Sequence, residues 1–529
     1  MTPPRWLPWL AAAFLLLLIT SMGWVSDDAY VTLRSVDLTW QGYGPVYNID
    51  ERVQGYTHPL WFGVLLLTYG LTGNPWLAAF LPALAATGLT LALVVLAFRD
   101  RPWRALVALG GLTAARAFLE YSTSGLENPL THLCLAGIVA ARLQWPGTLR
   151  LFAVAALTGI ALVNRLDSAV LVVPLFVATL IQDWDRGWPR VLASGVIVAL
   201  PLAVWELFSL VYYGVPVPNT AYAKLATGLP IGAKISMGST YLTHYIVHDP
   251  TGALLIAVAM IGTLLAGHKA TRPQIIAILL YLAYILWIGG DFMAGRFLAA
   301  PALLAAMVIA DLPRPHALRA PVAIIATWVL AVLGQAWFAI APQRLAQERA
   351  LVESGPYEAT RLWGIVDERS YFRSTLGFWA ALSNGFEPQR ITRTEGEALA
   401  KRALVQPQVA MPAQTGVYGF YAGPNVYVVD LYGLGDPLIA RLPMTTTATQ
   451  QWAPGHFPRA YPEGYVEGRG RGLNTIKDPD LAAYYETLRS VVSDPVFSAS
   501  RAENLWKLHT GQMNGRLRAY TDRLGTETP

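Results

Sequence analysis

Charged side chains are scarce in this sequence. Asp, Glu, Lys and Arg together make up 14% of the 529 residues, whereas hydrophobic residues make up 54%. Soluble domains carry about 25% charged residues, so the charge content here is well below that of an ordinary soluble protein. The mean hydropathy of +0.40 agrees with this deficit. The composition therefore excludes a soluble globular protein and predicts a polytopic membrane protein.

Cysteine and the common cofactor-binding motifs are also nearly absent. The single thiol, Cys134, lies in an apolar run, so an internal disulfide and a metal-thiolate cluster are both excluded. The chain has no Walker A loop and no dinucleotide-binding glycine pattern. His244 and His248 are four residues apart without an evident third ligand, so they predict no metal site. The net charge of +5 is explained by basic cytoplasmic loops rather than by nucleic-acid binding.

Apolar segments that cross or nearly cross a bilayer follow one another from residue 6 to residue 341. They predict roughly 11 to 13 transmembrane helices, of which the first is an uncleaved N-terminal helix. The region 58–98 is interrupted by Gly-Asn-Pro at 73–75, which predicts two helices, one of them tilted or partial. The distribution of Lys and Arg among the short loops places the N-terminus in the cytoplasm.

The composition changes after residue 341. Residues 342–529 mix charged residues, Gly and Pro and contain no long apolar run. Short strands broken by Gly are predicted over 409–441, and helices over 481–489 and 501–517. The sequence thus predicts a transmembrane region, 1–341, followed by a soluble α+β domain, 342–529, on the extracytoplasmic side.

Two adjacent carboxylates, Asp27 and Asp28, directly follow the first apolar run and open the first extracytoplasmic loop, 26–57. Carboxylates near lipid are costly, so this pair indicates chemistry or a cation site. One of them can take a proton from a sugar hydroxyl, and its neighbour can raise its pKa or help to hold a divalent cation. The alternative is that the pair caps and begins a helix over 29–40.

Other polar clusters fall in loops on the same predicted side of the membrane, and an active site requires such convergence. Arg296 begins an apolar helix, and a guanidinium group suits phosphate oxygens; its alternative role is to pair with Asp291. Lys224 is a candidate phosphate contact or an interfacial lysine. Glu127 either starts a helix or faces the site, and the pair Arg165 and Asp167 is otherwise an interfacial ion pair.

Five motifs, taken in chain order, resemble those of a known family. The first outer loop contains Asp27-Asp28-Ala29-Tyr30, Glu51-Arg52 and Gly55-Tyr56-Thr57; the others are Thr123-Ser124-Gly125-Leu126-Glu127, residues 218–224, residues 290–298 and residues 429–441. Together they resemble the GT-C superfamily of membrane glycosyltransferases. Within that superfamily they are most similar to the terminal β-(1→2)-arabinofuranosyltransferases of the mycobacterial cell wall.

The resemblance implies an inverting glycosyltransferase in a bacterial inner membrane. It would move arabinofuranose, or a related pentose or hexose, from a polyprenyl-phosphate donor to an extracytoplasmic glycan, glycolipid or glycoprotein acceptor. No nucleic-acid partner is implied. The only cofactor considered is a divalent cation near the acidic pair.

The resemblance also implies roles for individual residues. Asp27 would be the general base, and Asp28 would support it. The donor phosphate would be bound by Arg296, Lys224 and Arg52. The remaining substrate contacts would be made by Glu51, Tyr56, His58, Glu127, Asn128, Arg165, Asp167, Asn219 and Asp291.

Two other functions remain open from the sequence. One is a ligase or polymerase that moves whole lipid-linked glycans, since cavity size decides between this and single-sugar transfer. The other is a transporter or flippase, for which broken or charged helices at the bilayer midplane and repeated halves are expected. The polar clusters of this chain lie at helix ends, and its halves do not repeat.

Overall fold

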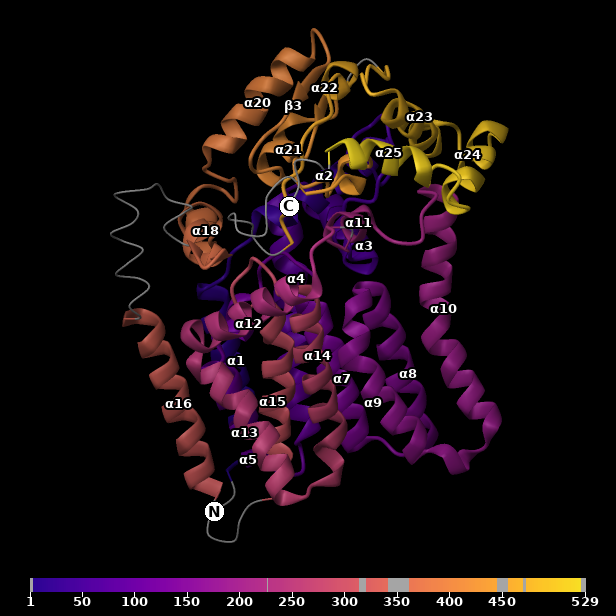
Figure 1. Cartoon of the computed structure of the whole chain (residues 1–529). Coiled ribbons are helices and arrows are strands. Elements are labelled where there is room, and N and C mark those ends of the chain that lie inside the picture. The colour runs from indigo at the N-terminus through magenta and orange to yellow at the C-terminus, as the bar shows by residue number, and fades with distance from the viewer. Residues whose placement is uncertain are drawn as a thin grey trace. The chain divides into compact units, whose positions relative to one another are not determined.

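The computed structural model describes residues 3–225, 227–313, 320–340, 361–444, 455–469 and 472–524. Helices dominate these residues, which fall into two compact units (Figure 1). Unit 1 comprises Met1–Ser26, Trp76–Leu202 and Lys234–Glu387, and unit 2 comprises Asp27–Pro75, Ala203–Ala233 and Pro388–Pro529. The expected boundary between membrane region and soluble domain, at 341–342, lies outside the described residues, so that division stays a prediction.

Unit 1 is a bundle of apolar helices. Within it α16 packs on α5, α13 on α15, α7 on α8 and α14 on α9. The helices are α1 (Leu7–Ser21), α4 (Pro75–Ala97), α5 (Pro102–Ala114), α6 (Arg116–Glu120), α7 (Asn128–Gln144), α8 (Gly147–Asn164), α9 (Ala169–Gln182), α12 (Ile231–His248), α13 (Pro250–Ala266), α14 (Arg272–Ile288), α15 (Ala299–Asp311) and α16 (Ala320–Ile340), together with the first part of α10 (Trp188–Tyr212).

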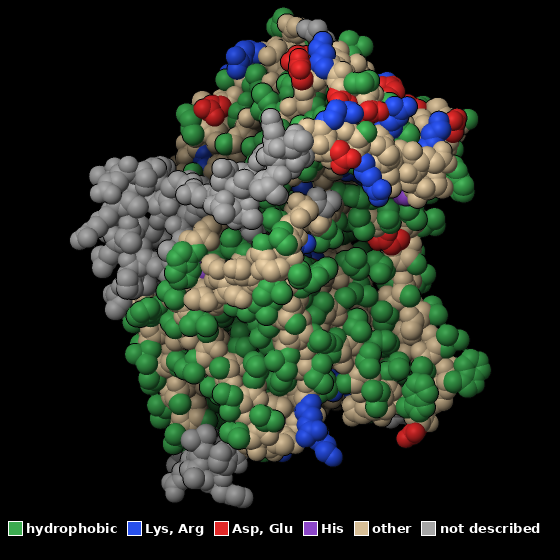
Figure 2. Space-filling view, in the orientation of Figure 1, with side chains coloured by type: hydrophobic (Ala, Val, Ile, Leu, Met, Phe, Trp, Pro, Cys, Tyr) green, Lys and Arg blue, Asp and Glu red, His purple; other side chains and the backbone are tan. Residues whose placement is uncertain are grey.

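Several of these helices have the length and composition of membrane spans. Among the described residues four are long and apolar enough, namely α4, α8, α10 and the segment Lys269–Ile288, and a fifth is added if α12 and α13, bent by 108°, form one span. Hydrophobic side chains cover the visible face of these helices (Figure 2), and Leu264 and Leu265 at the end of α13 are 80% and 82% exposed. Such leucines are explained by contact with lipid, so the chain is a multi-pass membrane protein. The exact number of spans stays a prediction.

The predicted interruption at residues 73–75 is confirmed. Helix α3 (Pro59–Thr72) ends at Gly73, whose φ of 63° lies in the left-handed region that glycine tolerates. Pro75 then begins α4, where its fixed φ suits the first helical position. Helix α3 has 14 residues and is therefore shorter than a full crossing requires.

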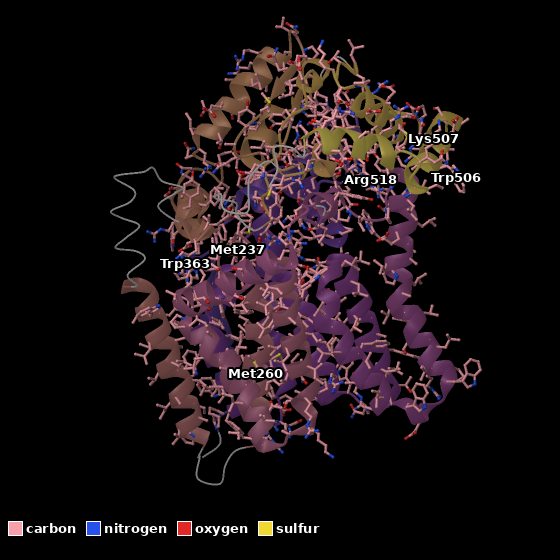
Figure 3. All side chains as sticks on the ribbon, in the orientation of Figure 1. Met237, Met260, Trp363, Trp506, Lys507 and Arg518 are labelled. Carbon is pink, nitrogen blue, oxygen red and sulfur yellow. The ribbon has the colours of Figure 1, made fainter. Side chains whose placement is uncertain are left out.

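A short hairpin in unit 1 positions part of the polar interior. Strands β1 (Arg361–Leu362) and β2 (Ile365–Val366) pair antiparallel around Trp363 and Gly364, both of which have positive φ, as a two-residue hairpin turn requires. Trp363 is exposed at this turn (Figure 3). The Val366 amide donates to the carbonyl of Phe292 at 2.7 Å, which fixes the hairpin against the segment after α14. Asp367 then caps α18 (Glu368–Leu376), and α19 (Phe378–Ser383) follows.

Unit 2 joins loops from the first half of the sequence to the C-terminal region. It contains α2 (Asp27–Trp40), α3, the end of α10, α11 (Asn219–Leu225), α20 (Ile391–Ala403), α21 (Gly416–Ala422), α22 (Tyr465–Gly468), α23 (Pro479–Ser493), α24 (Ala499–His509) and α25 (Asn514–Leu524). Strands β3 (Gln408–Ala410) and β4 (Val426–Val428) form a two-stranded parallel sheet.

Two details of unit 2 differ from the sequence prediction. Helix α21 occupies residues 416–422, where short strands were expected, and its N-terminus is capped from a distant segment. The predicted helix over 501–517 is two helices, because Gly511, with a φ of 74°, follows the end of α24. Exposed side chains such as Trp506 on α24 and Arg518 on α25 mark the solvent-facing surface of this region (Figure 3).

Two apolar clusters form the core of unit 2. One surrounds the sheet and includes Tyr47, Leu399, Val426 and Val428. The other packs α23 against the segments around Leu438 and Tyr465. The side chain of Tyr47 in the first cluster comes from the loop after α2, so this loop is part of the same core as the C-terminal sheet.

A buried arginine, Arg34 on α2, links the first loop to the C-terminal region within unit 2. Its guanidinium group donates to the carbonyl oxygens of Tyr47 at 2.7 Å, Gly423 at 3.1 Å and Val426 at 2.9 Å, and also to that of Gly419. A planar guanidinium group with five N–H donors is needed to reach all four carbonyls. Lysine, which has one ammonium group, therefore cannot replace Arg34.

Replacement Arg34→Lys is expected to lower the free energy of unfolding of unit 2 by about 3 kcal/mol, because buried carbonyls lose charge-assisted hydrogen bonds. Hydrogen exchange of α21 and β4 measures this loss. The matched control is Arg402→Lys, since Arg402 is exposed on α20 of the same unit. Equal protection of α21 in the two variants would contradict the assigned role.

Candidate functional site

The predicted site residues are distributed over both units. Unit 1 holds Glu127, Asn128, Arg165, Asp167, Asp291 and Arg296. Unit 2 holds Asp27, Asp28, Glu51, Arg52, Tyr56, His58, Asn219 and Lys224. The structure brings the six residues of unit 1 together at the ends of α7, α8 and α14 and at the start of the short helix η4 (Arg296–Leu298).

Ion pairs connect the charged residues of this unit 1 cluster. Arg296 contacts Glu127 at 2.9 Å and Asp291 at 3.6 Å. Arg165 contacts Asp167 at 2.6 Å and also pairs with Glu127. Glu127 is thus shared by two arginines that lie 131 residues apart in the sequence. Separate loops therefore converge on one carboxylate.

A small cavity lies beside these ion pairs. Its volume is about 20 Å³, and it is lined by Glu127, Asn128, Arg165, Asp167 and Arg296. The side chains of Arg165 and Asp167 are 20% and 14% exposed, whereas that of Glu127 is 1% exposed. Arg165 and Asp167 are therefore the charged groups that a ligand entering the cavity would meet first.

Aromatic rings complete the wall of the cavity. Tyr281 on α14 and Phe297 in η4 line it. The guanidinium carbon of Arg165 lies 5.5 Å from the centre of the Phe297 ring, within the range of a cation–π contact. The hydroxyl of Tyr284 donates to Asp167 at 3.3 Å and so orients that carboxylate.

In unit 2, Asp27 begins α2 and caps another helix, α21. Its carboxylate accepts hydrogen bonds from the backbone amides of Gly416 at 3.0 Å and Val417 at 2.9 Å. A Cβ atom at position 416 would clash with the backbone oxygen of Asp27, so the approach requires glycine there. Asp28 follows in the first turn of α2 and is half-buried.

The environment of Asp27 favours the protonated form of its carboxyl group more than water does. Burial raises the pKa of this carboxyl above its ordinary value. The amide of Val417, the guanidinium of Arg390 and the amide of Gly416 lower the pKa only in part. A raised pKa makes the ionised carboxylate a better proton acceptor at neutral pH.

Glu51 is a second buried carboxylate of unit 2. It accepts a hydrogen bond from Tyr427 at 2.5 Å and contacts Arg469 at 3.2 Å. Arg469 also contacts Asp436 at 3.5 Å. Burial raises the pKa of Glu51 to about 7, against the opposing effect of Arg469. Asp436 lies in the motif 429–441 that the sequence indicated, whereas Arg469 was in none of the motifs; both lie hundreds of residues from Glu51.

Arg52, Tyr56 and His58 make contacts that fix the first loop. The guanidinium of Arg52 donates to the carbonyl oxygens of Tyr212 at 3.2 Å and Val491 at 3.4 Å. The hydroxyl of Tyr56 lies 2.9 Å from that of Tyr213. His58 precedes α3, and its Nε2 lies 3.0 Å from the Thr32 hydroxyl. These contacts fix the position of the loop.

Asn219 and Lys224 lie at opposite ends of α11. The Asn219 amide donates to the carbonyl oxygens of Gly433 at 2.7 Å and Asp436 at 3.0 Å. Lys224 is in the last turn, where a Cβ built at Gly455 would lie 3.3 Å from its Nζ. Glycine at 455 therefore lets the backbone pass close to the ammonium group.

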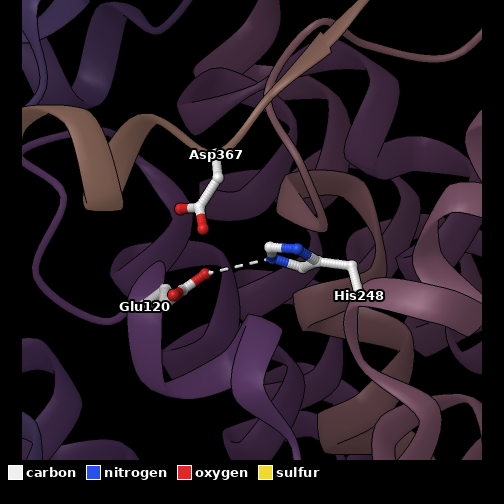
Figure 4. A group of neighbouring side chains, drawn as sticks. All are labelled: Glu120, His248 and Asp367. Carbon is white, nitrogen blue, oxygen red and sulfur yellow. Dashed lines mark ion pairs between the residues drawn. The ribbon is translucent and has the colours of Figure 1, made fainter. Parts of the chain in front are cut away.

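A further buried group in unit 1 was not predicted. The side chains of Glu120, His248 and Asp367 point toward one another from α6, α12 and the start of α18 (Figure 4). Nε2 of His248 lies 3.7 Å from the Glu120 carboxylate. His248 thus has carboxylate neighbours, although spacing alone had shown no third ligand. Each of these three residues lies more than a hundred positions from the other two in the sequence, so no local motif could have found them.

The three side chains have the chemistry of a metal site, and ligand atoms from all three lie within 4.8 Å of one another. Arg116 already binds both carboxylates, at 2.8 Å to Glu120 and 2.7 Å to Asp367, and lies 3.4 Å from Nδ1 of His248. A divalent ion would have to compete with this guanidinium group at close range. The arrangement therefore fits an arginine-centred ion-pair network better than a metal centre.

The network keeps both carboxyl groups ionised. Burial alone raises the pKa of Asp367, but Arg116 and His248 outweigh it, so the pKa lies well below its ordinary value. The pKa of Glu120 is lowered for the same reason, with burial opposed by Arg116 and His248. These two carboxylates are poor proton acceptors, in contrast to Asp27.

No protein family model matches the chain. The chain is nevertheless similar, over most of its length, to two named glycosyltransferases. These are the terminal β-(1→2)-arabinofuranosyltransferases of Mycobacterium tuberculosis, 27% identical across 84% of this chain and 82% of the relative, and of Corynebacterium glutamicum, 25% identical across 89% and 80%. The resemblance that the motifs indicated is thus confirmed.

Among solved structures, the chain is similar to ArnT from Cupriavidus metallidurans. The crystal structure of ArnT bound to undecaprenyl phosphate is 16% identical, with a TM-score of 0.47 over 80% of this chain and 85% of that chain. The structure in the apo state has the same identity and TM-score and is covered to 84%.

Replacement Arg116→Met is expected to destabilise unit 1 by about 3–5 kcal/mol, because two buried carboxylates lose their shared cation. Thermal unfolding of the purified protein in detergent measures the change. Chelation with EDTA is expected to leave the wild-type transition unchanged. A lower transition temperature after chelation would instead assign the cluster to a metal ion.

Unit 2 is expected to lose stability as the pH rises from 5 to 8. Burial raises the pKa of Glu51 from 4.5 to about 7, so the folded state holds a proton that the unfolded state releases between these values. The pKa values of Asp27 and Asp430 are also raised by burial, which gives the same sign. Protection of β4 from hydrogen exchange, corrected for the intrinsic rate, should therefore fall. Glu51→Gln should flatten this dependence, and a stability that increases with pH would contradict it.

Proposed function

We propose that this protein is an inverting glycosyltransferase that moves an arabinofuranosyl residue, or a related pentose or hexose, from a polyprenyl-phosphate donor to an extracytoplasmic glycan. The observation that carries the proposal is the similarity to terminal β-(1→2)-arabinofuranosyltransferases across more than four-fifths of the chain. The acidic pair at the start of α2 supplies the group that such a transfer needs.

Asp27 is the proposed general base. Its carboxylate takes the proton of an acceptor hydroxyl while that oxygen attacks the anomeric carbon of the donor sugar. The bond between the anomeric carbon and the phosphate oxygen breaks on the opposite face, so the configuration inverts and polyprenyl phosphate leaves as an anion. The raised pKa of Asp27 supports this role, and the two amides at α21 hold the carboxylate in one orientation.

Asp28 is the proposed partner of Asp27. It is half-buried in the same first turn of α2 as Asp27. A divalent cation at this pair would be held by the two carboxylates and would supply electrostatic stabilisation of the leaving phosphate. The proton transfer itself needs only the Asp27 carboxylate.

Lys224 is the proposed contact of the donor phosphate. The leaving group gains negative charge in the transition state, and a fixed cation stabilises that charge. Lys224 lies in unit 2, the unit that also holds Asp27, and Gly455 lets the backbone pass close to its ammonium group. Arg52 donates to backbone carbonyls, and we assign to it the positioning of the loop that carries Glu51 and Tyr56.

The composition of unit 2 supports an extracytoplasmic site. Two loops predicted on that side, 26–57 and 212–224, share one compact unit with the C-terminal region. This shared packing supports the prediction that the two loops and the C-terminal region face the same side of the membrane. The proposed base, its neighbour Asp28 and the proposed phosphate contact Lys224 all belong to this unit.

Replacement Asp27→Asn is expected to lower sugar transfer by about 100- to 10,000-fold, the usual contribution of a general base. Membranes containing the protein are incubated with labelled polyprenyl-phosphate sugars and an arabinan acceptor, and the products are analysed. Asn keeps one oxygen to cap α21, so hydrogen exchange of residues 416–422 checks that the fold is retained.

Asp50→Asn is the matched control, because Asp50 is exposed in the same loop and has no proposed role. Near-normal turnover of Asp27→Asn would reject the base assignment. Transfer of whole glycans rather than single sugars by the wild-type protein would reject the proposed reaction in favour of a ligase.

A further inference from the structure

Another pocket of unit 1, which the proposed sugar transfer does not use, lies at the end of the bundle where the chain begins, marked N in Figure 1. It is formed by the start of α1, the end of α4 and the loop that leads into α5. Its volume is about 360 Å³, within the usual range of ligand sites, about 300–1,000 Å³. We propose that this pocket binds the headgroup of an anionic phospholipid.

Two arginines line the pocket without forming an ion pair. Arg5 precedes α1 and Arg99 follows α4, and both side chains are exposed. Neither of them pairs with a carboxylate in the part of the chain that the structure describes, whereas Arg104 of α5 already pairs with Asp311 at 2.5 Å. The guanidinium groups of Arg5 and Arg99 can therefore bind phosphate oxygens through paired N–H donors.

The charge balance of the pocket matches a phosphodiester. One carboxylate, that of Asp100, lines the pocket beside the two arginines, and among the described residues it forms no ion pair with either. Two guanidinium groups and one carboxylate leave a single positive charge in excess. The phosphodiester of phosphatidylglycerol carries a single negative charge, so the occupied pocket is neutral.

The apolar part of the pocket fits the acyl chains of a lipid. Val95 and Phe98 are buried, whereas Trp9 and Leu96 are 45% and 42% exposed. Exposed apolar side chains of this kind meet lipid in a membrane protein, and tryptophan favours the level of the headgroups. The pocket thus offers cations and apolar surface side by side. A lipid uses both, but a soluble anion uses the cations alone.

The position of the pocket is also that of a lipid site. The distribution of Lys and Arg predicts that this end of unit 1 faces the cytoplasm, where basic pockets between membrane helices bind anionic headgroups. The loop that carries Arg99 is held in place, because its amide donates to the carbonyl oxygen of Leu96 at 3.3 Å. Gln144 of α7 donates to the carbonyl oxygen of Ala97 at 2.8 Å and fixes the same turn.

Lipid binding by charge variants tests the proposal. The purified full-length protein in detergent is titrated with phosphatidylglycerol or with phosphatidylcholine, and bound lipid is measured by native mass spectrometry. Each cation near a membrane surface contributes about 5-fold to the binding of anionic lipid, so Arg5→Gln with Arg99→Gln should weaken phosphatidylglycerol about 25-fold. Binding of phosphatidylcholine, which has no net charge, should not change. Asp100→Asn should tighten phosphatidylglycerol about 5-fold, an effect that misfolding cannot produce.

Arg101→Gln is the matched control, because Arg101 is exposed in the same loop but does not line the pocket. It should leave both affinities unchanged. Equal binding of phosphatidylglycerol by the double variant and this control would overturn the proposal, as would a wild-type protein that does not distinguish the two lipids.

Inorganic phosphate separates a lipid from a soluble anion. At a concentration equal to that of the lipid it should not displace phosphatidylglycerol, because it cannot use the apolar surface around Trp9 and Leu96. Displacement would assign the pocket to a soluble anion and would overturn the proposal. Because lipid binding is measured without turnover, a protein that transfers no sugar would refute the proposed function and leave the lipid affinities to decide on this pocket.

Discussion

Removing a guanidinium group from water costs several kcal/mol unless oxygen atoms replace its hydration, and this constraint organises both units of the protein. In unit 2 the oxygen atoms are mostly backbone carbonyls: Arg34, Arg459 and Arg501 each donate to carbonyls from more than one segment. In unit 1 they are carboxylates, which surround Arg116 and Arg296. Arginines therefore join the separate segments of each unit.

The same constraint separates two kinds of buried carboxylate. Glu120 and Asp367 share a close cation, and their pKa values fall below the ordinary range. Asp27 is met mainly by backbone amides, and burial raises its pKa. Environments that push the pKa values of acids apart also assign their roles. Burial likewise raises the pKa of Glu51, so Asp27 and Glu51 have raised pKa values, whereas Glu120 and Asp367 stay ionised and hold structure.

Part of this architecture could be predicted from the sequence. The break before Pro75 could be predicted from Gly-Asn-Pro at residues 73–75, because Gly and Pro disfavour a continuous helix. The polar loop residues that converge on Glu127 were expected to meet, because charge in a membrane protein must be gathered where it can be paired. Their pairing with one another, and the resulting excess of carboxylate, could not be foreseen, since it depends on side-chain positions in loops far apart in sequence.

Other features were beyond reach for a clear physical reason. Residues 417–421 are rich in Val, Tyr and Phe, which favour strands, yet they form α21. The local preference is overridden by a cap from Asp27, 389 residues away from Gly416. The network of Glu120, His248 and Asp367 likewise depends on three distant elements. Tertiary contacts of this kind leave no periodicity or spacing to read.

The assembly of unit 2 from three separated stretches has a consequence for biogenesis. When residues 27–75 leave the ribosome, the carbonyls that will receive Arg34 and the amides that will receive Asp27 have not yet been synthesised. The first loop must wait, with its charges hydrated, until nearly the whole chain is made. A truncated product therefore lacks the groups that bind Asp27 and Arg34, and unit 2 cannot fold around the acidic pair. The nascent protein stays inactive and accessible to proteolytic quality control until synthesis is complete.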